Sequence, residues 1–223
     1  MTAAHPTSIW LPLLGQTLRL LPERAIFWEE RRSLLVADAH WGKAATFRAS
    51  GIPVPGGTTR EGLQRLTVAV ERTDAEAVVF LGDFLHARAG RAAGTLRTLA
   101  AWRERHPHLD LLLIRGNHDR EAGDPPEDLG IRCVDAPVRE GPFLLAHHPA
   151  GSPAAYGIAG HVHPTVRLTG RARERQRLPC FWFGRHGVVL PAFGEFTGGA
   201  DVSPVPGDRI FVVAGEAVIE IPV

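Results

Sequence analysis

Five short apolar runs in this chain each end at residues of the kinds that bind metal ions. The runs read LLVADAH, VVFLGDFLH, LLLIRGNHD, FLLAHHP and YGIAGHVH, and they lie between Leu34 and His163. Continuous apolar runs of this length are typical of strands that are buried on both faces. Because ligands bind beyond the carboxyl ends of the strands in α/β sheets, we expect the polar residues after the runs to converge on one site.

Each ending, taken alone, also has a purely structural explanation. An Asp-x-His sequence or GNHD is typical of a turn or a capping device, and a histidine pair is often a surface feature. The recurrence of such endings at five strands favours a shared metal site instead. Gly82, Gly116 and Gly160 each come just before a ligand-type residue, where we expect a turn that glycine adopts most easily.

The apolar periodicity of the chain predicts an α/β fold. Residues 58–73 and 93–106 space their apolar side chains at helical intervals, and each stretch precedes an apolar strand. This alternation predicts a largely parallel sheet with covering helices. Strand-like runs dominate from about Ile131 onward, and no linker-like tract separates the two halves. We therefore expect one domain over residues 1–223, built from two packed sheets flanked by helices.

Composition and charge limit the location and the partners. Hydrophobic residues make up 44% and charged residues 22% of the chain, as in a folded soluble protein. A net charge of +1 supplies no global attraction for nucleic acid or membranes, so any basic surface must be local. The N-terminus has no basic leader, Pro12 interrupts its apolar run, and the two cysteines lie far apart. We expect a cytoplasmic protein without a membrane segment or a thiolate zinc site.

The types of candidate ligand indicate the metal and the chemistry. Histidine, carboxylate and amide oxygen without thiolate suit Mn, Fe or Zn, and Mn is the first choice. The candidates outnumber the ligands of one ion, so we expect two ions that share a carboxylate. Such a pair can activate a bridging hydroxide for in-line attack on a phosphoester. His118 is the candidate general acid for the departing oxygen, and Asp119 is the candidate that orients it.

The ordered motifs DAH, GDFLH, GNHD, HHP and GHVH resemble those of the calcineurin-like metallophosphoesterases, and the resemblance covers residues 34–164. It implies a four-layer αββα sandwich of two mixed β-sheets flanked by helices, with a dinuclear metal centre. It also places His118 beside the leaving group. The ligands it implies are Asp38, His40 and His163 for one metal, Asn117, His147 and His161 for the other, and Asp83 as the bridge.

The resemblance leaves two assignments to be made, the role of His86 and the choice between His147 and His148 as a metal ligand. The chain has GDFLH where many members have an acid or asparagine after Gly-Asp, so His86 is expected to face the substrate phosphate instead of a metal. Of the pair His147 and His148, the family position is the first.

Three further motifs, WGK, AGHVHP and LPAFGEFTGG (residues 190–199), resemble a narrower branch of the superfamily. This branch comprises the bacterial ligase-associated DNA damage response endonucleases, the PdeM-like enzymes. The resemblance implies a Mn-dependent phosphodiesterase that acts on DNA, single-stranded DNA in particular. It also implies a repair helicase and a ligase as partners.

A local basic segment, RLTGRARERQRLP, begins at Arg167. Its last four arginines alternate, so an extended strand would present them on one face, where they could follow a phosphate backbone. A solvated arginine-rich hairpin is the alternative. Other basic residues follow the metal motifs and are candidates for clamping the substrate. The full set of candidate substrate-binding residues is His86, Lys43, Arg88, Arg120, Arg171 and Arg173.

Three functions fit this pattern. The leading hypothesis is a phosphodiesterase that cuts single-stranded DNA in DNA repair. The second is a phosphatase or phosphodiesterase for a small phosphoester or a phosphoprotein, and the third is a non-catalytic, metal-stabilised binding module. Fold alone cannot separate the first two. A homo-oligomer is left open.

Overall fold

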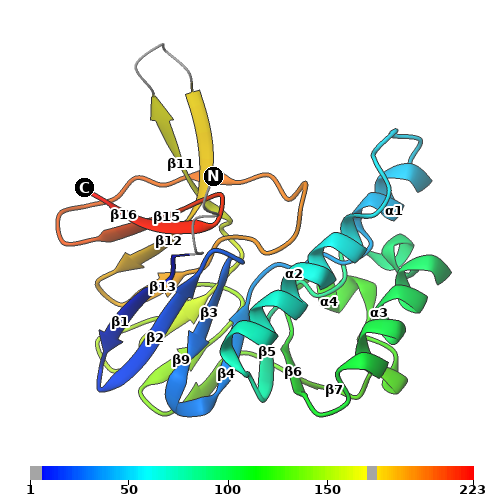
Figure 1. The fold of residues 1–223 in the computed structure, drawn as a ribbon, viewed down its shortest axis with the longest axis horizontal. Helices are drawn as coiled ribbons and strands as arrows, with labels where there is room; N and C mark the ends of the chain where they lie inside the picture. Colours follow the sequence, from blue (N-terminus) through cyan, green and yellow to red (C-terminus); the bar gives the residue numbers. More distant parts are fainter. Residues whose placement is uncertain (1–6, 170–174) are drawn as a thin grey trace, which may run out of the picture.

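The computed structural model describes residues 7–169 and 175–223, and these residues form two stacked mixed β-sheets with helices on one side (Figure 1). The first sheet has seven strands in sequence order, antiparallel from β1 to β4 and parallel from β4 to β7. Its strands are β1 (Ile9–Leu13), β2 (Gln16–Leu21), β3 (Ala25–Trp28), β4 (Ser33–Val36), β5 (Ala77–Leu81), β6 (Asp110–Ile114) and β7 (Ile131–Val134).

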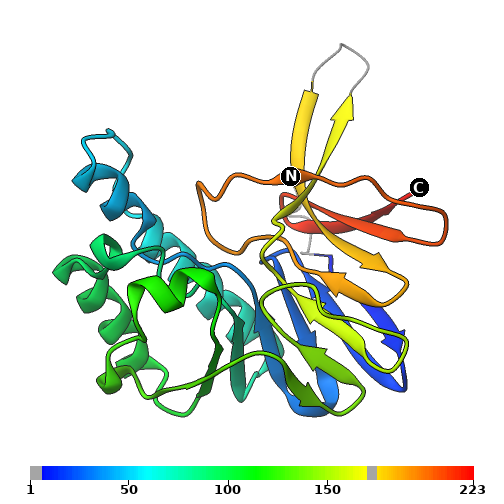
Figure 2. The same cartoon turned by 180° about the vertical axis from the view of Figure 1, so that it is seen from behind.

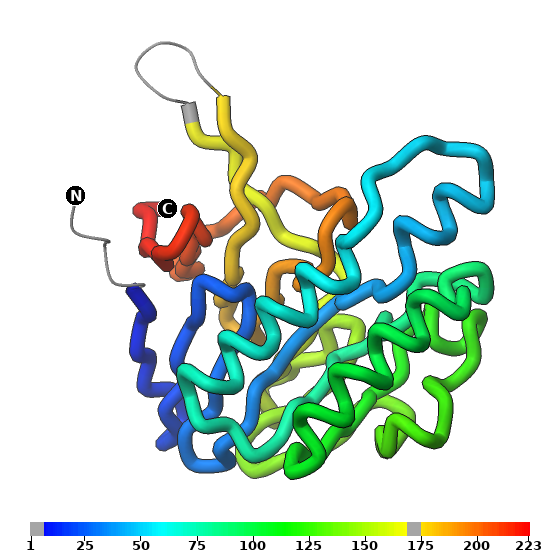
Figure 3. The backbone as a smooth tube through the Cα atoms, turned by 45° about the vertical axis from the view of Figure 1, so that its right-hand side comes forward, coloured from blue at the N-terminus to red at the C-terminus, as the bar shows by residue number. Residues whose placement is uncertain are grey.

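The second sheet has nine strands and contains the second half of the described chain (Figure 2). Its main path runs β14-β11-β12-β13-β10-β9-β8, with β15 paired to β12 and to β16. Figure 3 shows the hairpin of β11 and β12 projecting from the body of the protein. The strands are β8 (Val138–Glu140), β9 (Phe143–Leu145), β10 (Tyr156–Ala159), β11 (Pro164–Thr169), β12 (Arg175–Gly184), β13 (Gly187–Val189), β14 (Ala200–Asp201), β15 (Arg209–Ala214) and β16 (Ala217–Ile221).

The helices belong to the first half of the described chain. The α-helices are α1 (Lys43–Ala49), α2 (Thr58–Thr73), α3 (Ala93–Arg105) and α4 (Asn117–Ala122). Short 3-10 helices are η1 (Glu29–Arg31), η2 (Arg88–Arg91) and η3 (Glu127–Leu129). Among the described residues, no helix is both long enough and apolar enough to cross a membrane.

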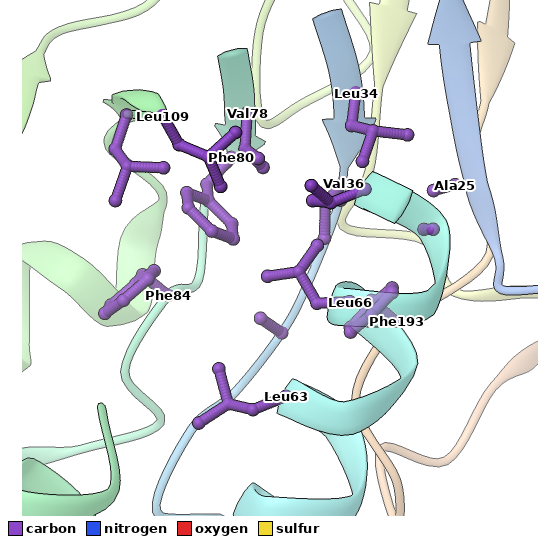
Figure 4. Packing of buried hydrophobic residues seen from close by; sticks show 14 of the residues in the cluster. Ala25, Leu34, Val36, Leu63, Leu66, Val78, Phe80, Phe84, Leu109 and Phe193 are labelled. Carbon is purple, nitrogen blue, oxygen red and sulfur yellow. The ribbon is translucent and has the colours of Figure 1, made fainter. Parts of the chain in front are cut away.

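Strand β4 has three consecutive apolar residues, Leu34 to Val36, because both faces of the strand are buried. Leu34 and Val36 lie in the core between the first sheet and the helices, together with Leu66 of α2 (Figure 4). Leu35 faces the other way and joins the core between the two sheets, where it meets residues such as Phe181. Burial on both faces requires apolar residues at consecutive positions, and it holds the end of the strand at a fixed place.

The α/β sandwich of two mixed sheets is confirmed. The helix expected over residues 58–73 is α2, and the one expected over 93–106 is α3, which ends one residue earlier. Strands β1, β7 and β8 and helices α1 and α4 were not expected. GNHD does not form only a turn, because Asn117 begins helix α4. The missed signal is Asp119 at the third helical position, which accepts a hydrogen bond from the Gly116 N–H at 2.9 Å.

Candidate metal centre

The first group of expected ligands comes together beyond β4 and β10. Asp38, His40 and His163 each offer a ligand atom, and these atoms all lie within 4.8 Å of one another. His163 Nε2 lies 3.4 Å from Asp38 Oδ1, and His40 Nε2 lies 3.7 Å from Asp83 Oδ2. Three residues from two different strand ends therefore face one point.

The second group gathers around His147, which is buried and follows β9. Its Nε2 atom lies 2.9 Å from Asn117 Oδ1, 3.1 Å from His161 Nδ1 and 3.4 Å from Asp83 Oδ1. Asp83 thus turns one oxygen toward His147 and the other toward His40, as a carboxylate shared by two ions would. Each group has a carboxylate and imidazole nitrogens in reach of a single cation.

The two adjacent histidines lie in different environments. His147 is 2% exposed, whereas His148 is exposed to solvent. The ring centroid of His148 nevertheless lies 4.0 Å from that of His161, and the nitrogens of His147, His148 and His161 also lie within 4.8 Å of one another. The geometry makes His147 the central residue and leaves His148 at the rim.

Backbone carbonyls hold two of these imidazoles in the orientation that a metal ligand needs. His147 Nδ1 lies 3.0 Å from the Leu81 carbonyl oxygen, and His163 Nδ1 lies 3.1 Å from that of Thr197. Since a carbonyl only accepts, each Nδ1 carries the proton, and the Nε2 lone pair faces the carboxylates. A metal-binding histidine is typically oriented in this way by a partner on its other nitrogen.

The carboxylate of Asp38 tests whether divalent cations fit here. Asp38 is fully buried, and its Oδ2 accepts a hydrogen bond from the His161 N–H at 2.8 Å. Its Oδ1 has no hydrogen-bond partner among the described residues. A buried carboxylate oxygen without a partner is costly, and a cation would satisfy it. The donor set therefore fits divalent metal ions.

The electrostatics of the cluster also favour bound divalent cations. Burial raises the pKa of the Asp83 carboxyl, and the nearby charge of Asp38 raises it further. Two buried acids this close repel one another unless cations lie between them. Burial lowers the pKa of His40 and of His147, so both imidazoles are neutral, which is the form that binds metals. At His163 burial also favours the neutral form, but the Asp38 carboxylate outweighs it and raises the pKa.

Backbone strain is concentrated at this centre. Ten non-glycine residues of the described chain have positive φ, and five of them are expected metal ligands, with φ between 47° and 70°. Such conformations are unfavourable for residues with a Cβ atom and persist where the surroundings hold them in place. The five expected ligands are Asp38, His40, Asp83, His161 and His163.

The glycines beside the ligands are required for two different reasons. Gly82 has a φ of +78°, as a turn that favours glycine requires. The same expectation was wrong for Gly116 and Gly160, which do not have positive φ and are needed for space. A Cβ atom on Gly160 would lie 2.5 Å from Asp38 Oδ2, and one on Gly116 would overlap Asp83 Oδ1.

His118 is placed to act on a substrate, but Asp119 does not orient it. His118 Nδ1 donates to the His86 carbonyl oxygen at 2.7 Å, which leaves Nε2 on the side of the metal cluster, 3.9 Å from Asp83 Oδ2. The side chain of His118 is 32% exposed. The Asp119 carboxylate instead accepts backbone N–H groups, those of Asp83 at 2.7 Å, Phe84 at 2.9 Å, Leu85 at 3.4 Å and Gly116 at 2.9 Å.

His86 packs against both His118 and His40, which belongs to the first ligand group. Its ring stacks on that of His118 with 4.9 Å between centroids, and its Nδ1 lies 3.4 Å from His40 Nδ1. The nitrogens of these three histidines lie within 4.8 Å of one another. Burial, with the charges of Lys43 and His118, lowers the pKa of His86 to about 4. A neutral His86 can accept a hydrogen bond or bind a metal, so its role toward a phosphate stays a prediction.

The basic residues that are expected to bind the substrate lie in different environments. Lys43 is half-buried at the start of α1, and the charges of Asp38 and Asp83 act on its ammonium group. Arg88 and Arg120 are exposed; Arg88 donates to the Glu121 carbonyl oxygen at 3.0 Å, and Arg120 lies 4.0 Å from Asp135. Among the described basic candidates, Lys43 is thus the one that interacts electrostatically with Asp38 and Asp83.

Two arginines of the arginine-rich segment form ion pairs with a carboxylate of the same chain. Arg171 and Arg173 lie outside the described residues. Arg177 Nε lies 2.7 Å from Asp201 Oδ1, and Arg167 Nε lies 2.5 Å from Asp201 Oδ2. Arg177 and Arg167 therefore already share a carboxylate, although both side chains are exposed, and binding of a phosphate backbone by this segment stays a prediction.

The sequence did not predict the backbone carbonyls that orient the imidazoles of His147, His163 and His118. The Leu81, His86 and Thr197 carbonyls belong to the backbone, and a side-chain motif does not reveal them. Thr197 lies in LPAFGEFTGG, so a glycine-rich loop between strands was the available signal.

Known structures now place the chain in a class. It is similar to the nuclease MPE of Pseudomonas putida, with 44% sequence identity, a TM-score of 0.84, and coverage of 96% of this chain and 100% of that one. The phosphoesterase YfcE of E. coli matches at 13% identity and a TM-score of 0.40, over 82% of this chain and 88% of that one. No family model and no curated protein matches the chain.

The fold and the site define a metal-dependent phosphoesterase, which is a hydrolase. The chain belongs to the calcineurin-like metallophosphoesterases, in the family of the nuclease MPE.

Proposed function

We propose that this protein is a dinuclear, Mn-dependent phosphodiesterase that cuts single-stranded DNA endonucleolytically during DNA repair in the cytoplasm. The observation that carries this proposal is the 44% identity to a nuclease over 96% of the chain. The convergence of carboxylates, imidazoles and an amide at one place supports it. A repair helicase and a ligase are the proposed partners.

The side chains divide between two metal sites in this proposal. Asp38, His40 and His163 would hold one ion, and Asn117, His147 and His161 the other. Asp83 would bridge them, since its two oxygens face the two groups separately. When bound, two divalent ions supply Lewis acidity and lower the pKa of water.

His118 supplies the proton in this mechanism. The His86 carbonyl fixes Nδ1, so His118 donates from Nε2, which lies on the side of the cluster and is open to solvent. The leaving group of a DNA strand is a sugar alkoxide, which departs poorly without a proton. Lys43 adds positive charge at the same place and favours binding of the anionic phosphate.

A small phosphoester remains the second candidate substrate because Asp201 binds Arg167 and Arg177. A hairpin whose arginines are paired internally attracts a DNA strand less. This observation favours a substrate that needs only the metal centre.

The test measures Mn-dependent hydrolysis of single-stranded DNA, a small nitrophenyl diester and a monoester by the wild type, Asn117→Ala and His118→Ala. We expect a chelator and Asn117→Ala to abolish every activity, because both remove metal from the centre. His118→Ala should slow DNA cleavage by about 100-fold or more. It should slow nitrophenyl release much less, since nitrophenolate leaves without a proton.

His108→Ala serves as the control, because His108 is an exposed histidine outside the centre, and it should behave as the wild type. Hydrolysis of the monoester with no cleavage of DNA by the wild type would replace the proposed function by the phosphatase. Equal losses for all leaving groups in His118→Ala would exclude this residue as the acid.

A further inference from the structure

A cavity of about 270 Å³ lies directly beside the metal centre. His163 lines it, together with residues 192 and 194–198 of one loop and with Arg24, Arg177 and Pro179. The same histidine faces Asp38 with its Nε2 atom, 3.4 Å away. The cavity is slightly smaller than the ~300–1,000 Å³ pockets that hold drug-sized ligands, and it suits a group the size of one nucleobase.

Phe196 is among the residues that line this cavity, and it is largely exposed instead of packed into the core. It is 53% exposed, although burial of a phenyl ring would stabilise the fold. Its φ is +56°, in the left-handed region that disfavours a bulky residue. A strained and exposed aromatic residue next to an active centre indicates a functional position.

The loop that carries Phe196 is anchored on both sides of the residue. The N–H groups of Phe193 and Gly194 donate to the carbonyls of Ala37 at 2.8 Å and Asp38 at 3.0 Å. On the other side, the Thr197 carbonyl oxygen binds His163 Nδ1 at 3.1 Å. The backbone on both sides of Phe196 is therefore held on the same framework as two expected metal ligands, so little backbone freedom is lost when the residue binds a flat partner.

Two ion-pair clusters at the lining of the cavity carry excess positive charge. Glu195, which lines the cavity, lies 2.7 Å from Arg65 Nη1 and 3.3 Å from Arg24 Nη1, so one carboxylate meets two guanidinium groups. Arg177 also lines the cavity, and it shares the Asp201 carboxylate with Arg167. Each cluster keeps one uncompensated positive charge, which suits the phosphates on either side of a base.

We propose that Phe196 and this cavity form a nucleobase subsite, where a base next to the cleaved phosphate of a single strand stacks on the phenyl ring. This inference rests on the proposed function and names how the site selects a nucleic acid over other phosphoesters. Stacking on an aromatic ring tolerates every base, so it gives affinity for single strands without sequence preference. Figure 3 shows the segment around residues 190–205, in orange, between the projecting α1 region and the hairpin of β11 and β12.

The test compares two substrates that differ only in their bases. One is a single-stranded oligonucleotide, and the other has the same backbone with abasic nucleotides around the cleavage position. The wild type should lose about 10-fold or more in kcat/KM on the abasic strand. Phe196→Ala should cut the normal strand as slowly as the abasic one, because the stacking surface is gone.

Two further variants separate stacking from loop structure. Phe196→Trp keeps a flat ring and should restore the preference for the strand with bases, whereas Phe196→Leu keeps apolar bulk only and should not. Trp10→Ala removes an aromatic residue of similar exposure, 54%, on β1 and should match the wild type.

The outcomes distinguish this inference from the proposed function. A normal base preference in Phe196→Ala, or one that Leu restores as well as Trp, would overturn the subsite while DNA cleavage stands. A wild type that cuts neither strand, yet hydrolyses a small diester, would overturn the proposed function and the subsite with it.

Discussion

At the scale of single residues, Gly116 offers the sharpest test of how the centre is built. A Cβ atom there would overlap Asp83 Oδ1 and meet the His147 ring at 3.0 Å. Gly116→Ala should displace the proposed bridging carboxylate and reduce phosphoesterase activity by at least ~100-fold, while the chain stays folded. Activity and manganese binding by calorimetry measure the loss, and circular dichroism checks the fold.

Gly94→Ala is the matched control for this change. Gly94 lies in α3, and nothing lies within 4 Å of a Cβ atom built on it. Alanine should stabilise the helix by up to ~1 kcal/mol and leave activity at the wild-type level. If Gly116→Ala bound manganese as tightly as the wild type, metal binding would not depend on the present position of the Asp83 carboxylate.

Residue by residue, the convergence of the candidate ligands could be predicted because they are side chains of characteristic type at the ends of recognisable strands. Gly116 and Gly160 were predicted for the wrong reason, since local sequence shows conformational freedom but not which carboxylate fills the space across the sheet. Asp119 was assigned to His118 because the two are adjacent in sequence. Apart from Gly116, its backbone partners lie more than thirty positions away in the sequence, and only the fold brings them into contact with it.

At the scale of elements, Asp119 ties the start of α4 to the loop after β5. Its buried carboxylate accepts four backbone N–H groups, from Gly116 and from residues 83–85. Asp119→Ala would leave these four donors unsatisfied at ~1–3 kcal/mol each, so we expect a total loss of at least ~4 kcal/mol. For a chain of this size that lowers Tm by roughly 8–16 °C or more, which thermal unfolding measures.

The comparison for Asp119→Ala is Asp128→Ala, at an exposed position in η3, with a Tm near that of the wild type. If Asp119→Ala kept its Tm and instead showed the leaving-group dependence of His118→Ala, the residue would orient the acid after all.

Apolar patterns in the sequence predicted most helices and strands, but they did not predict the short helices α1 and α4. Strand β4 buries three consecutive apolar residues, and helix α2 buries apolar residues at helical intervals over 16 residues, so both sequences are recognisable. Helix α1 buries one residue, Ala44, and α4 buries Asp119 and Ala122. Such short helices have too little apolar periodicity to be predicted, and contacts from distant loops stabilise them.

At the scale of the whole molecule, a net charge of +1 means that affinity for a single strand depends on where the charges lie. Asp201 neutralises one of the two arginines that it contacts on the β11–β12 hairpin. Asp201→Asn should free positive charge beside the cavity and increase the affinity for single-stranded DNA. The plot of log Kd against log salt concentration should steepen by roughly 0.7 for each additional phosphate contacted.

Asp128→Asn changes the net charge by the same amount at η3, so it separates a local effect from a global one. If position decides, only Asp201→Asn steepens the salt dependence, because counterions are released where phosphates are bound and distant charges are screened over about 10 Å at ordinary ionic strength. Equal slopes in both variants would mean that the hairpin does not contact the strand, and the DNA would then have to bind along another face of the molecule.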